Sequence, residues 1–298
     1  SNRMHTINGY MFCNHPEMKM KVGQNVRWYL MSLGNMVDLH TAQWDGQTVK
    51  VEEGKTTDTV TLLPSSMATA DQQPDECGMW NVHCAVGMHK AAGMMLKTTI
   101  EPSDDGKCWD DFSSSTQHVY YIAAEEVEWD YLPSGSNQCS RTDPAEGIDG
   151  TDRVRVEGEH IGSKYKKSRY VQYTDMSYTT KIPGDINAGL LGPTMRAEVG
   201  DTIVVLFLNR LVERAVNIFP RGVNFGYWGA SAGVEPSNFS PQVYVWQIKK
   251  TAGPDFDSGA DSRVWTYQST ANVGSDIQSG LLGPLIIYKA GTLGADGI

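Results

Sequence analysis

The chain has 298 residues, of which 40% are hydrophobic and 20% are charged, so it is long enough for about two domains with substantial cores. No apolar run approaches the ~18 residues that a membrane helix needs, so a transmembrane protein is excluded for this segment and no membrane contact is expected from it. The 35 acidic and 25 basic residues give a net charge of -10, which repels phosphate backbones. Nucleic acid is therefore not an expected partner.

Short segments rich in β-branched and aromatic residues alternate with Gly, Pro and Asn/Asp turn signals along the whole chain. No long segment with a helical period competes with them, so the pattern predicts an all-β fold of antiparallel sandwiches or barrels. In chain order, we expect strands at residues 26–31, 48–52, 59–63, 80–84, 119–123, 154–156, 203–209, 243–248, 263–268 and 285–288.

An acidic, serine-rich and aperiodic stretch at residues 101–116 separates two groups of predicted strands. Such a composition suits a linker that few contacts cross. We therefore expect a first unit over residues 1–112 and a second unit over residues 117–298. Two polar, glycine-rich insertions, at residues 134–150 and 251–262, are predicted to be surface loops.

The sequence Gly-Leu-Leu-Gly-Pro occurs twice, at residues 189–193 and 280–284. Each copy precedes an apolar segment, and a Gly-Pro turn commonly leads into a strand. The repeat predicts that both copies lead into strands of one sandwich in the second unit.

The segment from Cys84 to Met94 carries the clearest chemical signal. The thiolate of Cys84, the imidazole of His89 and the thioether of Met94 follow a strand at a spacing that can surround one ion. Two histidines and one cysteine with a weak axial methionine form a blue-copper electron-transfer site, so a second histidine is needed, and His40 is the candidate. Composition alone favours the alternative that Cys84 is a small core residue and that the methionines fill gaps.

The cysteine count is odd, so at least one cysteine lies outside any intrachain disulfide: the five are Cys13, Cys77, Cys84, Cys108 and Cys139. Strand alternation puts Trp80, Val82 and Cys84 on one face, toward a buried site, while His83 faces the other way. Cys84 is therefore the expected unpaired cysteine. The other four permit three connectivities.

The chain begins at Ser1 without the features of a signal peptide, so we expect a mature or internal piece. Asn238, in the sequence Asn-Phe-Ser, is a candidate glycosylation site if the protein is secreted. The remaining histidines without ligand spacing are expected to be surface or structural residues: His5, His15, His118 and His160.

Several stretches resemble one family, the ceruloplasmin and hephaestin multicopper ferroxidases. Its copper-bearing, even-numbered cupredoxin domains are similar to residues 1–12, residues 34–42 and the loop after Cys84. The odd-numbered domain that follows is similar to residues 117–131, 170–175 and 190–202. The order resembles the end of domain two plus domain three. The resemblance implies tandem cupredoxin-like (plastocyanin-like) Greek-key β-sandwiches, the first incomplete at its N-terminus and the second without copper.

The resemblance also implies a function, as a segment of a multicopper oxidase, a ferroxidase, that is secreted or is the ectodomain of a membrane-anchored protein. One type 1 copper, on His40, Cys84, His89 and Met94, would relay single electrons from a reductant such as Fe(II) toward an oxygen-reducing trinuclear centre in other domains. The implied partners are these remaining cupredoxin domains, of the same protein or of another chain. The alternative is a non-enzymatic scaffold resembling the A domains of coagulation factors five and eight.

Three departures from the family pattern limit what this chain does alone. The trinuclear cluster of the family needs histidines on both sides of the copper cysteine, and here Ala85 follows Cys84. It also needs a His-x-His-Gly run in an odd domain, where residues 219–222 read Phe-Pro-Arg-Gly. The family often has a glutamate that holds iron four residues before the first copper histidine, and this chain has Met36. No trinuclear centre is therefore expected in this segment, nor direct iron docking.

The first unit is shorter than a domain of this family, which runs ~150 residues. Its N-terminal strands are therefore expected to come from another chain or from another part of the same polypeptide. The even domains of the family carry a disulfide from the strand after the Asn-Gly-Tyr run to the segment beyond the copper loop. The resemblance thus implies a bridge between Cys13 and Cys108.

Overall fold

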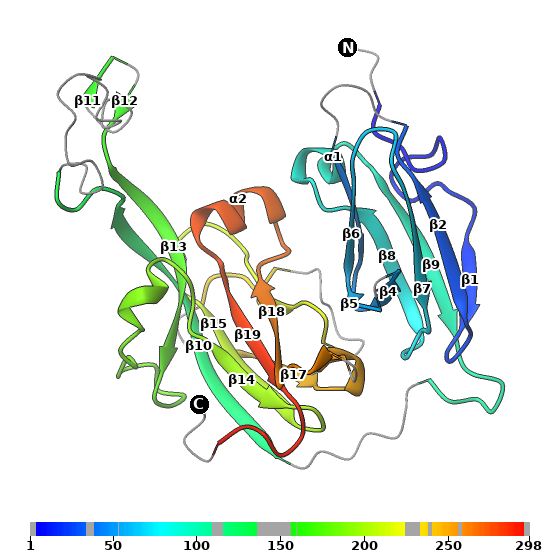
Figure 1. Cartoon of the computed structure of the whole chain (residues 1–298). Coiled ribbons are helices and arrows are strands. Elements are labelled where there is room, and N and C mark those ends of the chain that lie inside the picture. Colours follow the sequence, from blue (N-terminus) through cyan, green and yellow to red (C-terminus); the bar gives the residue numbers. More distant parts are fainter. Residues whose placement is uncertain are drawn as a thin grey trace.

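The computed structural model describes residues 4–33, 39–52, 54–108, 116–135, 156–158, 160–223, 233–237, 240–255 and 258–294. Figure 1 shows two β-sheet units, the first coloured blue to cyan and the second green to red. The described helices are short: α1 (Gly87–Ala91), α2 (Val273–Ser279), and the 3-10 turns η2 (Ile186–Ala188) and η3 (Lys250–Ala252). The all-β class predicted from the sequence is confirmed. Within the described ranges, no helix is long and apolar enough to cross a membrane.

The first unit consists of two sheets, in the orders β1-β9-β8-β3-β6 and β2-β7-β4-β5. Its core lies between them and includes Trp44, Val49, Val82 and Leu96. The strands are β1 (Met18–Lys21), β2 (Val26–Met31), β3 (His40–Trp44), β4 (Val49–Val51), β5 (Thr56–Thr57), β6 (Thr59–Leu62), β7 (Met67–Gln72), β8 (Gly78–Cys84) and β9 (Met95–Glu101).

The second unit has two four-stranded sheets, in the orders β13-β10-β15-β17 and β14-β19-β18-β16, and a short hairpin of β11 and β12. The strands are β10 (Gln117–Asp130), β11 (Val156–Glu157), β12 (His160–Ile161), β13 (Lys164–Tyr173), β14 (Met195–Glu198), β15 (Thr202–Asn209), β16 (Phe219–Pro220), β17 (Gln242–Gln247), β18 (Ser262–Gln268) and β19 (Leu282–Tyr288).

Alternating side chains build the core of the second unit. Ile203, Val205 and Phe207 of β15 point inward at every second position and are fully buried. They meet Trp246 of β17 and Leu285 of β19, so both sheets contribute to one cluster. Each such side chain stabilises the fold by about 1.5–3 kcal/mol.

The two units are built on the same plan, which the strand pairing makes visible. β1 pairs in parallel with β9, the last strand of the first unit, just as β14 pairs in parallel with β19. β2 pairs antiparallel with β7, just as β15 pairs with β17. On its other side, β15 also pairs in parallel with β10, and β10 pairs with β13. β2 corresponds to β15, but among the described residues no strand pairs with its other side, so the counterparts of β10 and β13 are not present. This agrees with a first sandwich that is incomplete at its N-terminus.

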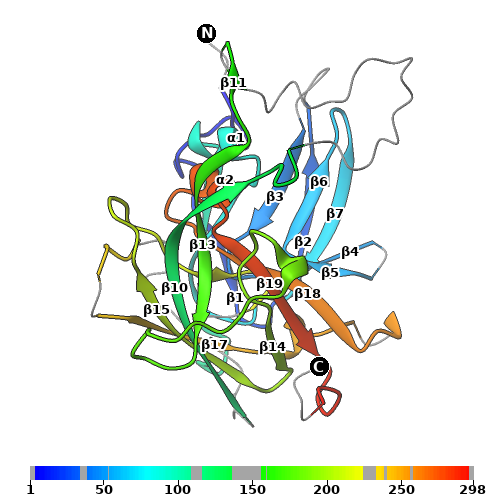
Figure 2. The same cartoon turned by 90° about the vertical axis from the view of Figure 1, so that its left-hand side faces the viewer.

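Two side-chain contacts between the units come from the β4-to-β6 region of the first. The guanidinium of Arg221 donates to both carboxylate oxygens of Asp58, each at 2.7 Å. The hydroxyl of Thr56 donates to Asp255 at 2.5 Å. Helices α1 and α2 also lie next to each other, as both views show (Figures 1 and 2). No strand of one unit pairs with a strand of the other in the part of the chain that the structure describes.

The disulfide links Cys77 to Cys108, which corrects the bridge expected between Cys13 and Cys108. The backbone N–H of Cys77 also donates to the carbonyl of Cys108 at 2.8 Å. Cys13 lies at the other end of β9, where its N–H donates to Met95. The seven residues of β9 separate the two ends by about 20 Å. A disulfide needs Cα atoms about 4.4–6.8 Å apart, so Cys13 is out of reach.

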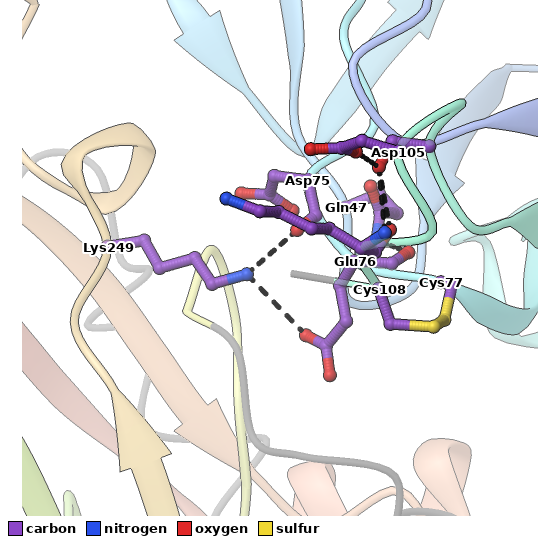
Figure 3. Close-up of a disulfide and its surroundings, with 9 residues drawn as sticks. Gln47, Asp75, Glu76, Cys77, Asp105, Cys108 and Lys249 are labelled. Carbon is purple, nitrogen blue, oxygen red and sulfur yellow. Dashed lines mark hydrogen bonds and ion pairs between the residues drawn. A yellow bond between two sulfur atoms is a disulfide. The ribbon is translucent and has the colours of Figure 1, made fainter. Parts of the chain in front are cut away.

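The bridge also lies close to a contact between the two units (Figure 3). The ammonium of Lys249, from the second unit, donates to the carbonyl of Asp75 at 3.0 Å. It lies 3.9 Å from the carboxylate of Glu76, the residue before Cys77. Burial raises the pKa of Glu76 above its ordinary value, although the charge of Lys249 acts against this rise. Cys139 lies outside the described residues.

Candidate metal centre

Three side chains of the first unit converge at one end of its five-stranded sheet. Cys84 ends β8, His40 begins β3, and His89 lies in α1. Ala42 lies opposite Cys84 in the antiparallel pair of β3 and β8. His40, two residues before Ala42, therefore faces the same side of the sheet as Cys84. The ligand atoms of Cys84 and the two histidines all lie within 4.8 Å of one another.

The two distances from sulfur to nitrogen are those expected of ligands to one metal ion. The Sγ atom of Cys84 lies 3.5 Å from Nδ1 of His89 and 3.8 Å from Nδ1 of His40. First-row metal ions lie about 2.0–2.3 Å from nitrogen and sulfur ligands, so two ligands about 120° apart are separated by about 3.5–3.8 Å. One thiol and two imidazoles are thus the kind of ligand set that copper takes.

The surroundings of the sulfur suit an anionic ligand that is shielded from water. Cys84 is only 2% exposed. Its Sγ atom receives the backbone N–H of Thr41 at 3.5 Å, a contact that stabilises the negative charge of a thiolate. Strand β3, which pairs with β8, therefore donates directly to the sulfur atom of Cys84.

Met94, the fourth predicted ligand, is held beside the other three through its backbone. The N–H of Cys84 donates to the carbonyl of Met94 at 3.0 Å, and the N–H of Met94 donates to the carbonyl of His89 at 3.0 Å. Gly93 makes the turn between them, with a φ of 96° that favours glycine. Glycine also leaves room for the ring of Phe12, because a Cβ at position 93 would lie only 2.7 Å from that ring.

His5 also reaches the site, which no spacing in the sequence indicates. Its ring stacks on the ring of His89, with centroids 4.0 Å apart and an angle of 20° between the planes. The N-terminal segment is held there because Phe12 donates to the carbonyl of Gly93 at 2.8 Å and Cys13 to that of Met95 at 3.1 Å. Only this long-range pairing brings His5 to the site.

A buried polar cluster supports the backbone of Cys84 from the opposite face of β8. His83 is 3% exposed, and its Nδ1 atom lies 3.0 Å from the carbonyl of Cys84. A carbonyl only accepts, so Nδ1 carries the proton of this bond. Nε2 lies 3.0 Å from the carboxylate of Asp45 and 3.1 Å from the ammonium of Lys90.

The electrostatics of this cluster favour an ionised carboxylate. Burial alone raises the pKa of Asp45, but the hydrogen bond from His83 and the charges of His83 and Lys90 outweigh it, so the pKa lies below the ordinary value of 3.8. Strand alternation correctly predicted that His83 faces away from the side of Cys84. Its partners Asp45 and Lys90 were not predicted.

The positions that the family uses for its trinuclear cluster serve other roles here. Phe219 and Pro220 form β16, and Arg221 is committed to Asp58. Within the described ranges, only one group of histidine, cysteine and acidic ligands is compact enough for a metal ion. The glycosylation candidate Asn238 and the family-variant position Met36 lie outside the described residues.

Comparison with known proteins agrees with this geometry. Residues 1–104 match the family model described as multicopper oxidase. Over its whole length the chain is 33% identical to "Ferroxidase HEPHL1" of Homo sapiens, 35% identical to "Hephaestin" of Mus musculus and 36% identical to "Ceruloplasmin" of Mus musculus. The chain is thus similar in sequence, over its whole length, to ferroxidases of the multicopper oxidase type. It spans about a quarter of the length of these relatives, 26% of the first two and 29% of the third.

The solved structures add only a loose match. A structure described as a multicopper oxidase aligns with 94% of this chain and 80% of its own, at a TM-score of 0.29 and 12% identity. The relationship to multicopper oxidases therefore rests on sequence similarity. The disulfide between Cys77 and Cys108 fits the extracellular or ectodomain location expected for a multicopper oxidase of this type, because such bonds persist in oxidising compartments.

Proposed function

We propose that the first unit holds one type 1 copper ion and relays single electrons. The observation that carries this proposal is the convergence of one buried thiol and two imidazole nitrogens within 4.8 Å at the end of the sheet. Two histidines and a cysteine in a plane, with a weak methionine above it, form a blue-copper site. A bound copper would supply one-electron redox chemistry between Cu(II) and Cu(I).

Each ligand has a separate task in this proposal. Cys84 provides the anionic sulfur ligand, and its burial keeps water from the metal-binding position. His40 and His89 would bind the copper through their Nδ1 atoms. Met94 would be the weak fourth ligand, and a thioether donor of this kind tunes the redox potential. His83 fixes the carbonyl of Cys84 and thereby orients the ligand from behind.

The whole protein, on this proposal, is a multicopper oxidase with ferroxidase activity. Electrons would come from Fe(II) or a small reductant and would pass to a trinuclear centre formed by further cupredoxin domains, the expected partners of this chain. The similarity to a protein named "Ferroxidase HEPHL1" supports the choice of substrate. The rival function is a binding scaffold of the kind seen in coagulation factors five and eight, which share the fold without needing this ligand set.

A spectrum and a copper count test the proposal together. The purified chain should bind one copper and show an intense blue absorption band, and Cys84→Ser should abolish the band. Cys13→Ser is the matched control, because Cys13 is the other unpaired cysteine among the described residues and is not one of the proposed ligands. A band that survives Cys84→Ser would refute the ligand assignment. A well-folded chain that binds no copper would favour the scaffold.

A further inference from the structure

The ring of His5 lies on the face of the imidazole of His89, one of the proposed copper ligands. The two ring centroids are 4.0 Å apart, and the ring planes are inclined by 20°. An imidazole binds a metal through a ring nitrogen, whose lone pair lies in the plane of the ring. In His89 this nitrogen is Nδ1, which lies 3.5 Å from Sγ of Cys84. A ring stacked on the face of His89 therefore does not compete for the nitrogen that would bind copper.

The helix that carries His89 is too short to fix the orientation of this ring. Helix α1 has five residues, and its N-cap residue, Val86, makes no side-chain hydrogen bond to the helix. Isolated helices shorter than roughly 12–15 residues are marginal in water. Rotation of an imidazole about χ2 is also broad rather than confined to staggered wells. The orientation of the ligand ring therefore depends on the side chains that pack around it.

The segment that carries His5 is anchored to the loop of the metal centre. The backbone N–H of Phe12 donates to the carbonyl of Gly93 at 2.8 Å. Ile7 and Tyr10 exchange two backbone hydrogen bonds of 3.0 Å, which close a turn between His5 and this anchor. The anchor and the turn restrain the position of the His5 ring relative to the loop.

We propose that His5 is a positioning residue of the metal centre: its ring holds the imidazole of His89 in the orientation that binds copper, and it does not itself bind the metal. The proposal rests on the function proposed above, because it needs a copper ion at this site. Removal of a group that orients a metal ligand typically costs about 10–100-fold in metal affinity. We expect the lower end of this range, because the ring of His40 also lies beside His89, with centroids 4.9 Å apart.

Competition for copper tests this role. The full chain is titrated with Cu(I) against the chromophoric chelator bicinchoninate. His5→Ala removes the ring and should hold Cu(I) about tenfold more weakly than the unaltered chain does. His5→Phe keeps a ring that stacks but has no nitrogen, so its affinity for Cu(I) should equal that of the unaltered chain. The control is His15→Ala, because the ring of His15 packs against Tyr10, and it should also leave the affinity unchanged.

The spectrum of bound Cu(II) gives a readout that a change in stability alone would not move. His5→Ala should shift the blue absorption band and the copper hyperfine splitting in electron paramagnetic resonance, because the orientation of one nitrogen ligand changes. His5→Phe should restore both signals to those of the unaltered chain. If His5→Ala does not fold, His5→Leu takes its place in the comparison, with the same expected result.

Two results would overturn the proposal. The first is that loss of the ring leaves both the affinity and the spectrum unchanged. The second is that His5→Phe loses as much affinity as His5→Ala, because the site would then need the nitrogen atoms of His5 rather than its stacked ring.

Failure of this proposal can be told apart from failure of the proposed function. An unaltered chain that folds but shows no blue band refutes the type 1 site, and the role of His5 with it. A blue band that is present in the unaltered chain and identical in His5→Ala, with equal affinity for Cu(I), refutes only the role of His5.

Discussion

Two backbone hydrogen bonds hold Met94 beside the proposed copper ligands, so its side chain can be changed without releasing the loop. Met94→Leu should keep the copper and raise its redox potential, because loss of a weak axial donor destabilises Cu(II) more than Cu(I). A differential of ~1.4 kcal/mol corresponds to ~59 mV for a one-electron couple. A redox titration of the blue band measures the change. A lower potential in the variant would contradict the axial role.

Glu125 provides a test of stability away from the metal centre. Its carboxylate is partly buried, and burial raises its pKa. Hydrogen bonds and charges from Lys181 at 2.6 Å, Tyr173 and Arg210 lower the pKa by more than burial raises it, so the pKa falls below the ordinary value of 4.5. A lowered pKa in the folded state means that this stabilisation is present above about pH 4.5 and is lost as the pH falls. Glu125→Gln should therefore cost about 1.5–3 kcal/mol at pH 7 and less at pH 4.

Urea unfolding of the full chain at both pH values measures this difference. The control is Glu126→Gln, because Glu126 points to the other face, is more exposed and pairs with Lys166 at 2.6 Å. Its loss should cost less than about 1 kcal/mol. If the Glu125 variant and the wild type differed equally at pH 7 and pH 4, the ionised carboxylate would not be the source of the stability.

Local spacing explains which residues of the site could be predicted. Cys84, His89 and Met94 belong to one loop, so their ligand pattern is visible in the sequence. His40 was found through a resemblance to known ligand sequences as well as through the need for a second imidazole. His5 and Asp45 reach the site only through long-range strand pairing, and nothing in their neighbourhood in the sequence marks them.

At the scale of elements, the strands differ in how well the sequence predicts them. The segment that became β2 was predicted with its observed bounds because it is aromatic and apolar. β1 was missed and β14 was expected only from the Gly-Leu-Leu-Gly-Pro repeat, since neither of these four-residue strands contains a β-branched residue. Their parallel pairing with the last strand of each unit joins segments far apart in the sequence, which no local pattern specifies.

The repeated Gly-Leu-Leu-Gly-Pro sequence does lead into strands of one sandwich, and these strands, β14 and β19, are direct neighbours. A turn before the strand was expected at both copies, but in the second copy Gly283 lies within β19 itself. A Cβ on Gly192 or Gly283 would lie 2.6 Å or 2.3 Å from the side chain of Tyr267. The two glycines thus make room for Tyr267, whose hydroxyl donates to Pro193 at 2.5 Å.

The unpaired side of β2 leads to a prediction about fragments. Tyr29 and Met31 are 73% and 66% exposed on this strand, and Met67, opposite Met31, is 77% exposed. An exposed apolar edge strand promotes association with other chains. Residues 1–112 expressed alone should therefore aggregate or require a partner, whereas residues 117–298 should fold as a complete sandwich. A cooperative melt of the first fragment as a soluble monomer would show that no strands are missing.

At the scale of the whole molecule, the division into units 1–112 and 117–298 stays a prediction, which the same fragments test. The contacts between the units include polar ones: the pair of Asp58 with Arg221, and Lys249 near Asp75 and Glu76. Such a contact aligns the two units without a shared apolar core.

Electron counting predicts what the isolated chain does with oxygen. Reduction of O₂ to water takes four electrons, whereas one type 1 copper stores one, and Ala85 and Arg221 occupy positions where the family has histidines. The chain should therefore accept one electron from a small reductant, lose its blue colour and reoxidise slowly in air. An oxygen electrode measures this. Rapid, sustained oxygen consumption would mean that a second copper centre exists in this chain.

X-ray absorption at the copper edge tests the central claim most directly, because it reports the ligand atoms around the metal in the intact chain. The account predicts one copper per chain with one short bond to sulfur and two bonds to nitrogen, from Cys84, His40 and His89. Cys84→Ser should remove the short sulfur bond. Copper bound to nitrogen and oxygen alone in the unaltered chain would contradict the account.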